Sequence, residues 1–207
     1  YSRDRDLAAI QVRWCMDSSS SRIVTHPRAL SEPADERSDI VWLDDPRATN
    51  ADMVGAKAAH LSRLAQRHCI PPGFCLTADA HLTREFGGRV GMNLRSAIAR
   101  AYKQLAARCG SDSPAVAVRS SAIDEDGPHA SFAGQHETYL NIRGVESICD
   151  AVERCWASAQ TEQVLAYRRR HNLPIDQVRI AVLIQLLVPA DVSAVLFSIN
   201  PVTCARD

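Results

Sequence analysis

The sequence predicts an α+β fold, because helical and strand-like patterns alternate along a chain long enough to bury a core. Three segments carry apolar residues at helical spacing, and two short apolar runs bounded by turn residues read as buried strands. The chain has 207 residues, of which 46% are hydrophobic, so it can bury one sizeable core or two small lobes.

The first two helices are expected after position 50 and between positions 94 and 107. Asn50 or Asp52 could cap the first of them. The second is amphipathic, with its apolar residues on one side. The expected apolar faces consist of Val54, Ala58, Leu61 and Leu64 in the first helix and of Ile98, Ala101, Tyr102 and Leu105 in the second.

Two further helices are expected downstream. One places Cys149 and Cys155 among the apolar residues of an amphipathic helix, where packing accounts for them. The other ends in the arginines 168–170, which we interpret as its solvated end, where cations suit the helix dipole. The remaining apolar positions of the first of these helices are Val145, Ile148, Val152 and Trp156.

Two strands are expected to be buried. The run 114–118 would deliver Arg119 to the end of its strand. The run 180–188 contains Gln185 in its middle, and a buried glutamine must find partners or cost a few kcal/mol. A bound ligand is one such partner, and the protein backbone or water is the alternative.

The segment from Arg119 to Gln135 has the composition of a phosphate-holding loop. Arginine offers a rigid fork of donors to phosphate oxygens. Residues 130–134 have little side-chain bulk, so their backbone amides could come close to a ligand. The alternative is a surface loop in which Arg119 pairs with the acidic residues 124–126, a solvated ion pair of little consequence.

The residues of this segment resemble the signature of the ATP-binding domain of phosphoenolpyruvate synthases and rifampicin phosphotransferases, in the pyruvate phosphate dikinase superfamily. The likeness is greater to this water-using branch than to the phosphate-using dikinases. It continues in the same order through most of the chain from about position 54 to position 207. The matching stretches are 54–61, 70–74, 119–135, 137–144, 155–158, 167–171, 188–197 and 200–203.

The resemblance implies an ATP-grasp first lobe over residues 51–207, with the second lobe absent from this chain. Lys57 and Arg119 would hold the phosphates of ATP, and both are carried over as catalytic residues. Gly134, Thr138 and Gln185 would line the nucleotide pocket. The family transfers the β-phosphoryl group of ATP to a histidine and releases AMP and phosphate. Magnesium would be held by residues of the second lobe, so no metal ligand is expected in this chain.

The resemblance also has departures that favour an alternative. The family has glycines on both sides of the lysine, where this chain has Ala56 and Ala58, and the stretch between positions 74 and 114 is shorter than in the family. A second ATP-grasp lobe and a phosphohistidine swivelling domain would be needed in cis or in trans, so we expect the chain alone to be inactive. The alternative is a degenerate noncatalytic lobe that acts as a nucleotide sensor or partner subunit and could form a homodimer.

Residues 1–29 could form a hairpin, and residues 30–50 are expected to be a linker. Equal numbers of acidic and basic side chains, 24 of each, provide no field for nucleic acid or an anionic membrane. Seven cysteines without a Cys-x-x-Cys pair argue against a disulfide framework or a zinc site. With no targeting sequence or apolar run long enough to span a bilayer, we expect a cytoplasmic protein.

Overall fold

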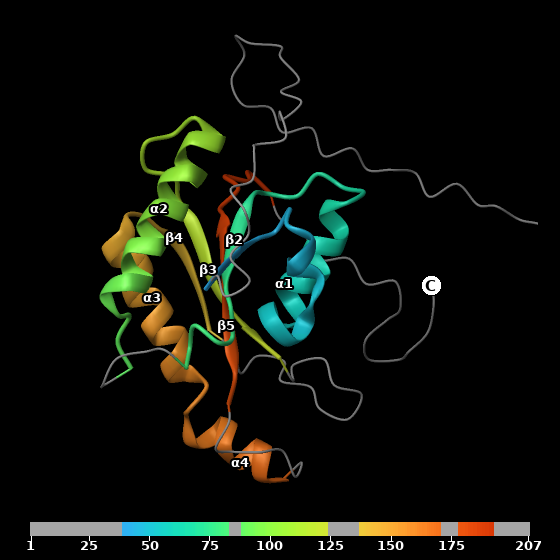
Figure 1. Ribbon diagram of the computed structural model, residues 1–207, viewed down its shortest axis with the longest axis vertical. Helices are drawn as coiled ribbons and strands as arrows, with labels where there is room; N and C mark the ends of the chain where they lie inside the picture. The colour runs from blue at the N-terminus through green and yellow to red at the C-terminus, as the bar shows by residue number, and fades with distance from the viewer. Residues whose placement is uncertain (1–38, 83–87, 124–136, 171–177, 193–207) are drawn as a thin grey trace, which may run out of the picture.

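The computed structural model describes residues 39–82, 88–123, 137–170 and 178–192 as helices, strands and connecting loops around one five-stranded sheet (Figure 1). All four strand pairings are antiparallel, which together with the helices confirms the α+β class. The strands are β1 (Ile40–Trp42), β2 (Gly73–Leu76), β3 (Val116–Ala122), β4 (Thr138–Ile142) and β5 (Ile180–Leu186). The helices are the 3-10 helix η1 (Pro46–Thr49) and the α-helices α1 (Ala51–Ala65), α2 (Met92–Cys109), α3 (Val145–Ser158) and α4 (Glu162–Arg170).

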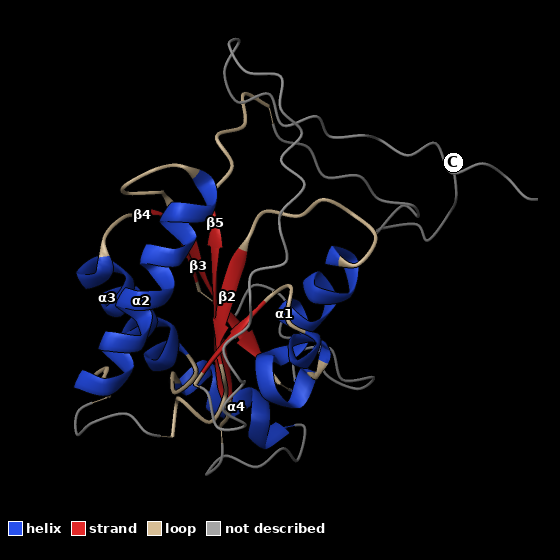
Figure 2. Cartoon of the chain, turned by 45° about the horizontal axis from the view of Figure 1, so that its top comes forward, coloured by secondary structure: helices blue, strands red, loops and turns tan. Residues whose placement is uncertain are grey.

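Helices cover both faces of the sheet. Helix α1 lies on one face, and α2 and α3 lie side by side on the other (Figures 1 and 2). Successive residues of a strand point to opposite faces, so each strand contributes to two cores. On β5, Leu183 is buried in the core beneath α1, and Ile184 is buried in the larger core beneath α2 and α3. The alternation of the strands thereby sets which side chains face α1.

The strand order in the sheet is β1-β2-β5-β3-β4, so the strand that comes last in sequence lies at the centre. Strand β5 pairs with β2 through Gly73 to Leu76 and with β3 through all seven β3 residues. Strand β4 lies at an edge and pairs with β3 across a bulge, where Leu140 and Asn141 stand opposite Ala117 alone. Asn141 has a positive φ of 57°, in the left-handed region that asparagine tolerates better than most residues.

The predicted linker over residues 30–50 is wrong for residues 40–50. Strand β1 pairs with β2, and Val41 at its centre is completely buried. Helix η1 follows and is capped by Asp45, whose carboxylate accepts a hydrogen bond from the Arg47 amide at 2.9 Å. These residues belong to the folded body because β1 extends the sheet and helps to bury α1. Residues 1–38, with the hairpin expected over 1–29, lie outside the described residues.

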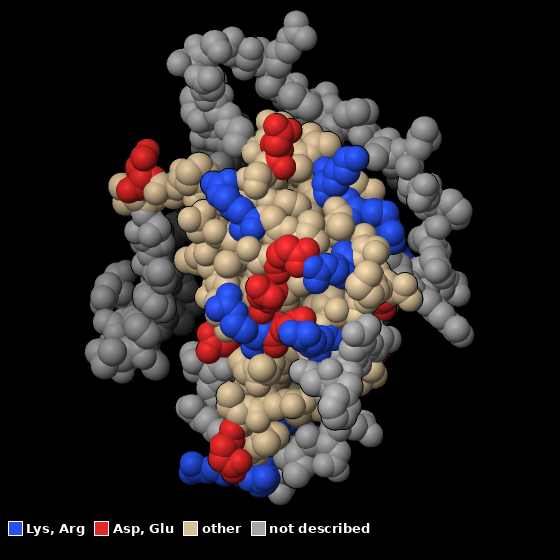
Figure 3. Space-filling model, turned by 90° about the vertical axis from the view of Figure 1, so that its left-hand side faces the viewer, with Lys and Arg blue, Asp and Glu red and all other residues tan. Residues whose placement is uncertain are grey.

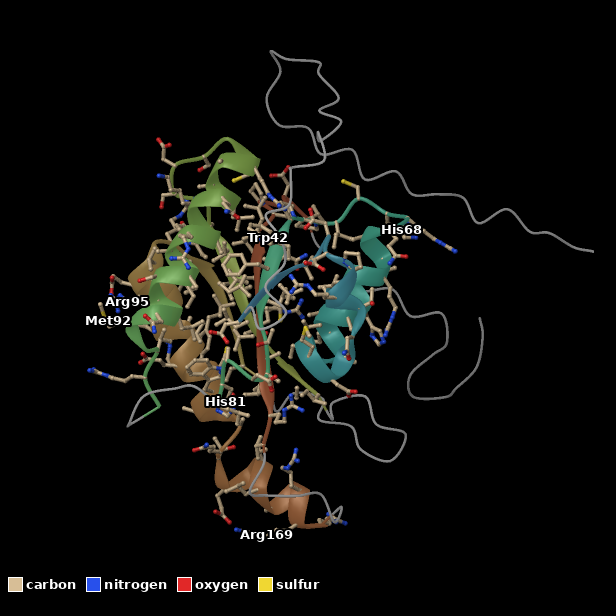
Figure 4. The ribbon with its side chains drawn as sticks, in the orientation of Figure 1. Trp42, His68, His81, Met92, Arg95 and Arg169 are labelled. Atoms are coloured by element: carbon tan, nitrogen blue, oxygen red, sulfur yellow. The ribbon has the colours of Figure 1, made fainter. Side chains whose placement is uncertain are left out.

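Helices α2 and α3 confirm the amphipathic faces predicted for them, since the predicted residues are buried except for Val145, which is partly buried against the larger core. The face predicted for α1 is partly wrong, because Leu64 is 47% exposed while Ala59 and Ser62 are buried. The solvated end predicted for α4 is also wrong at Arg168, which is only 4% exposed. Arg169 does lie at the surface, where it pairs with Glu162 at 2.9 Å (Figure 4).

Charges of both signs are interspersed on the side of the molecule formed by α2 and α3 (Figure 3). Arg95 of α2 forms an ion pair with Glu146 of α3 on this side, and Met92 lies beside Arg95 at the outer surface of α2 (Figure 4). A surface with alternating signs produces no extended field of one sign. Among the described helices, none is both long enough and apolar enough to cross a membrane.

Candidate functional site

The register of the sheet places three of the predicted site residues on the same face. Arg119 lies opposite Leu183 on one side and opposite Thr138 on the other. Residues directly opposite each other in an antiparallel pair project to the same face, and Leu183 is buried beneath α1. Gln185 lies two positions further along β5 and therefore shares that face. Arg119, Thr138 and Gln185 consequently surround the part of the sheet that α1 covers.

Arg119 lies inside its strand, not at its end as predicted. Strand β3 continues for three residues beyond it to Ala122, because β5 pairs with it over its whole length. The side chain is half-buried, and its Nε is buried without a hydrogen-bond partner among the described residues. A buried donor without an acceptor costs free energy that an anionic ligand would recover.

Helix α1 contains a kink that changes the setting of Lys57. Gly55 has φ 77° and ψ 164°, which is not helical, so residues 51–54 form a separate first turn. The predicted capping role of Asn50 is confirmed, since its side chain accepts a hydrogen bond from the Asp52 amide at 3.0 Å. The main helical segment begins after Gly55, which puts Lys57 in the first turn of that segment. Its cationic side chain therefore lies where the helix dipole favours an anion.

The beginning of this helical segment rests directly on β3. The Ala58 amide donates a hydrogen bond to the Ser121 hydroxyl at 3.3 Å, and Ser121 is completely buried. A Cβ atom at Gly55 would overlap the carbonyl and hydroxyl oxygens of Ser121, so only glycine allows this approach. Lys57 is thus carried by a segment fixed to the strand that carries Arg119, two residues before Ser121.

The two alanines that flank Lys57 are directed into the protein. Ala56 is 6% exposed and Ala58 is completely buried. Their methyl groups are therefore packed within the fold and do not cover the solvent side of the segment. The replacement of the family's glycines by Ala56 and Ala58 therefore leaves the solvent side of this segment open.

Gln185 has a partner within the protein. Its side-chain amide nitrogen donates a hydrogen bond to the Pro71 carbonyl at 3.0 Å, which is the alternative considered for a buried glutamine. The neighbouring Gly73 makes this contact possible, because a Cβ there would come within 2.6 Å of the Ile184 carbonyl oxygen. The loop before β2 thereby fixes the side-chain amide, whose nitrogen must face the carbonyl because a carbonyl can only accept.

Two of the sequence-based predictions lie outside the described residues. Gly134 and the loop 124–136 are among the residues whose placement the structure leaves undescribed, and so are the acidic residues 124–126. Thr138 follows that loop, begins β4 and is exposed. The described part of the site therefore consists of Lys57, Arg119, Thr138 and Gln185.

Gly55 and Ser121 are site residues that the sequence analysis did not single out. Both belong to stretches quoted for the family resemblance, and that membership was the only available signal. A glycine within a helical pattern reads as an ordinary weak position. Position 55 must be a glycine because of its close contact with Ser121. Ser121 lies 66 positions away in sequence but next to Gly55 in the structure.

The described residues offer no metal site and no activated thiol nearby. No three histidine, cysteine, aspartate or glutamate side chains come together within the described ranges. Burial raises the pKa of the Cys75 thiol, which lies beneath α1, and raises the pKa of Cys155 to about 12. Thiols with raised pKa values stay protonated and are poor nucleophiles. The chemistry that these residues can perform is anion binding.

Comparison with known proteins agrees with this chemistry. Residues 87–207 match the family described as "Pyruvate phosphate dikinase, AMP/ATP-binding domain". Similar proteins include the phosphoenolpyruvate synthase of Aeropyrum pernix, which is 35% identical over 83% of this chain and 26% of its own length. A probable phosphoenolpyruvate synthase of Methanocaldococcus jannaschii is 34% identical over 79% of this chain and 17% of its own length. The rifampicin phosphotransferase of Bacillus subtilis is 33% identical over 81% of this chain and 23% of its own length.

The match covers most of this chain but only about a quarter or less of these relatives. It includes β3 with Arg119, β4 with Thr138 and β5 with Gln185, so three of the four described site residues lie within the matched domain. The family match and the sequence identity to these relatives lead to one conclusion: this chain belongs to the pyruvate phosphate dikinase AMP/ATP-binding domain family.

Proposed function

We propose that this chain is the phosphate-holding lobe of an ATP-dependent phosphotransferase. In the complete enzyme the β-phosphoryl group of ATP would pass to a histidine on another domain, with release of AMP and phosphate. The observation that carries the proposal is the position of Arg119, whose buried Nε lacks a partner among the described residues on the face shared with Thr138 and Gln185. The cytoplasmic location and the homodimer expected from the sequence stay predictions.

The proposed site combines three sources of positive potential. Arg119 supplies a planar fork of donors, and Lys57 supplies a compact point charge. The amides at the start of the α1 segment after Gly55 add the positive end of the helix dipole. These groups act on the phosphates of ATP by holding them in place and by stabilising charge on the transferring phosphoryl group. Thr138 and Gln185 would contact the remainder of the nucleotide.

Magnesium would reach the site with the nucleotide and not through ligands of the described residues. No cluster of acidic side chains that could hold a metal is present in the described part of the chain. We therefore assign magnesium binding to the proposed second ATP-grasp lobe. The second lobe and the phosphohistidine domain would act in cis or in trans, and they would also select the phosphoryl acceptor.

Isothermal titration of the full chain with ATP and magnesium tests the proposal. We expect Arg119→Ala to weaken ATP binding by about 10-fold to 100-fold, the effect of losing charge-assisted hydrogen bonds. Arg119→Lys should recover part of the loss, because it restores charge without the fork. Arg100→Ala is the matched control, since Arg100 is exposed on α2 at the opposite face of the sheet.

Far-ultraviolet circular dichroism shows whether Arg119→Ala is folded. The proposal fails if the folded variant binds ATP as tightly as the native chain. A separate measurement addresses the alternative function. If the native chain binds ATP but supports no release of AMP when the second lobe and the histidine domain are supplied, it acts as a nucleotide sensor or partner subunit.

A further inference from the structure

We propose that Ser121 is a positioning residue, which fixes the segment carrying Lys57 to strand β3 and so sets the spacing between Lys57 and Arg119. The inference rests on the proposed function, because it assigns a role to the spacing of the two phosphate-binding residues. Ser121 would not contact the nucleotide. It would act through the backbone of residues 55–58.

The contact between Ser121 and this segment has two independent parts. The buried Ser121 hydroxyl accepts the hydrogen bond of the Ala58 amide, one of the amides that an α-helix leaves without a partner in its first turn. The backbone of Gly55 also approaches Ser121 so closely that a Cβ has no room. The hydroxyl therefore caps the helical segment from a distant strand, as an N-cap residue does from within the chain.

The position of Ser121 on β3 explains why its contact affects the site. Successive residues of β3 point to opposite faces of the sheet. Arg119 and Ser121 therefore project toward α1, and Ser120 between them projects toward α3. A displacement of the α1 segment relative to β3 would move Lys57 away from Arg119 without altering either side chain. Small displacements of this kind weaken the binding of a ligand that both groups must hold.

The neighbouring Ser120 provides a matched control. It is 1% exposed, as buried as Ser121, and its hydroxyl donates a hydrogen bond to the Glu137 carbonyl at 3.3 Å. Ser120→Ala therefore removes the same atom from the same strand and breaks a bond of the same length. It leaves the contact between β3 and α1 in place.

The first measurement is amide hydrogen exchange of the full chain without nucleotide. We expect faster exchange of the amides 55–60 in Ser121→Ala and unchanged exchange there in Ser120→Ala. Unchanged protection of residues 55–60 in Ser121→Ala would overturn the inference. This arm is independent of ATP, so it distinguishes a failure of the inference from a failure of the proposed function.

The second measurement is the affinity for ATP and for AMP by titration. We expect Ser121→Ala to weaken ATP binding by about threefold to tenfold, the range for one lost hydrogen bond. AMP, which lacks the β- and γ-phosphates, should bind as before. Equal weakening of both nucleotides, or unchanged ATP affinity together with faster exchange, would overturn the positioning role.

A double-mutant cycle tests whether Ser121 acts through Lys57. In a Lys57→Ala background, Ser121→Ala should cause no further loss of ATP affinity, because the side chain that it positions is gone. The same fold-loss in both backgrounds would show that Ser121 acts on the fold in general. If Ser121→Ala does not fold, Ser121→Cys makes the same comparisons with a weaker acceptor in place.

Discussion

The described cysteines differ in burial and therefore in expected reactivity. Cys75 is completely buried, and burial raises its thiol pKa, while the pKa of Cys155 is raised to about 12. Cys69 is exposed in the loop between α1 and β2. At pH 8 we expect iodoacetamide to modify Cys69 in the folded chain and to leave Cys75 and Cys155 unmodified until denaturant is added. Peptide mapping by mass spectrometry measures each site, and labelling of Cys75 at the rate of Cys69 would contradict the expectation.

Tyr102 joins three segments through one hydroxyl group. The hydroxyl donates to the Pro114 carbonyl before β3 at 2.8 Å and accepts from the Gly144 amide before α3 at 3.2 Å. The residue is only 6% exposed. Tyr102→Phe would leave the Pro114 carbonyl and the Gly144 amide without this hydroxyl as a partner. We expect a loss of about 1–3 kcal/mol in the free energy of unfolding.

Urea denaturation measures the Tyr102 effect. Ser96→Ala is the control on the same helix, because the exposed Ser96 hydroxyl bonds, among the described residues, only to the Met92 carbonyl one turn earlier. We expect the control to change the free energy of unfolding by less than about 0.5 kcal/mol. Similar losses in the two variants would show that the Tyr102 hydroxyl has no special role.

The sequence names candidate residues but predicts their surroundings poorly. Arg119 was predicted at a strand end, although the alternation of alanine and valine in 115–118 already fits a strand continuing in the same pattern. Arg168 was predicted to be solvated on the strength of two neighbouring arginines, but the packing of α4 buries it. Local sequence contains the identity of a side chain, whereas its exposure depends on segments far away in the chain.

At the scale of elements, η1 depends on the pairing of Asp45 and Arg47. Hydrogen bonds from the Arg47 side chain and amide lower the pKa of the Asp45 carboxyl below its ordinary value of 3.8. A carboxyl with a lowered folded-state pKa stabilises the fold above its unfolded-state pKa, and this contribution disappears as the pH falls through the folded-state value.

Asp45→Asn removes the charge but keeps a residue suited to capping. We expect it to lower the free energy of unfolding by only about 0.5 kcal/mol at pH 7, because the pair is partly exposed to solvent. The difference should vanish in acid, below the folded-state pKa of Asp45. Denaturation curves at pH 7 and at successively lower pH values measure it. A difference that persists unchanged in acid would exclude a charge effect.

Helix α1 shows what a periodic pattern predicts and what it omits. The helix, its Asn50 cap and the burial of Val54 and Ala58 follow from local spacing. The kink at Gly55 does not follow from local spacing. After this kink, the buried face contains Ala59 and Ser62 and not the predicted Leu64. The positive φ of Gly55 is required by the tertiary contact with Ser121, and only the folded structure contains that contact.

At the scale of the whole molecule, two cores share the central strand β5. Leu183 and Ile184 are adjacent, completely buried and directed into opposite cores. We expect Leu183→Ala and Ile184→Ala each to lower the free energy of unfolding by about 2–5 kcal/mol, the usual cost of such a cavity. Because one strand carries both cores, unfolding should remain a single transition in each variant.

Two probes can measure this cooperativity. Fluorescence of Trp156, isolated by replacing Trp14 and Trp42 with phenylalanine, reports on the core beneath α2 and α3. The Trp156 ring is 2% exposed and contacts His81 with 5.6 Å between ring centroids. Far-ultraviolet circular dichroism reports on all the helices, including α1. Coincident urea transitions are expected for both variants. Separate transitions in Leu183→Ala would show that the α1 side unfolds independently.

The composition and periodicity of the chain were sufficient for the fold class, and the family resemblance supplied the candidate site residues, whose roles stay predictions. Neither could predict that β5 lies between β2 and β3, because antiparallel order is not determined by the pattern of one strand. The register that brings Arg119, Thr138 and Gln185 to one face follows from this order. The arrangement of the site is therefore a property of the whole sheet.

The central position of β5 has a consequence for protein synthesis. Strands β1 and β2 can pair with each other, and so can β3 and β4, while the chain is still emerging from the ribosome. The inner edges of β2 and β3 stay unpaired until residues 180–186 have been translated and have left the exit tunnel. Unpaired strand edges attract other chains, so nascent or prematurely terminated chains that lack β5 should be the species that most need chaperones.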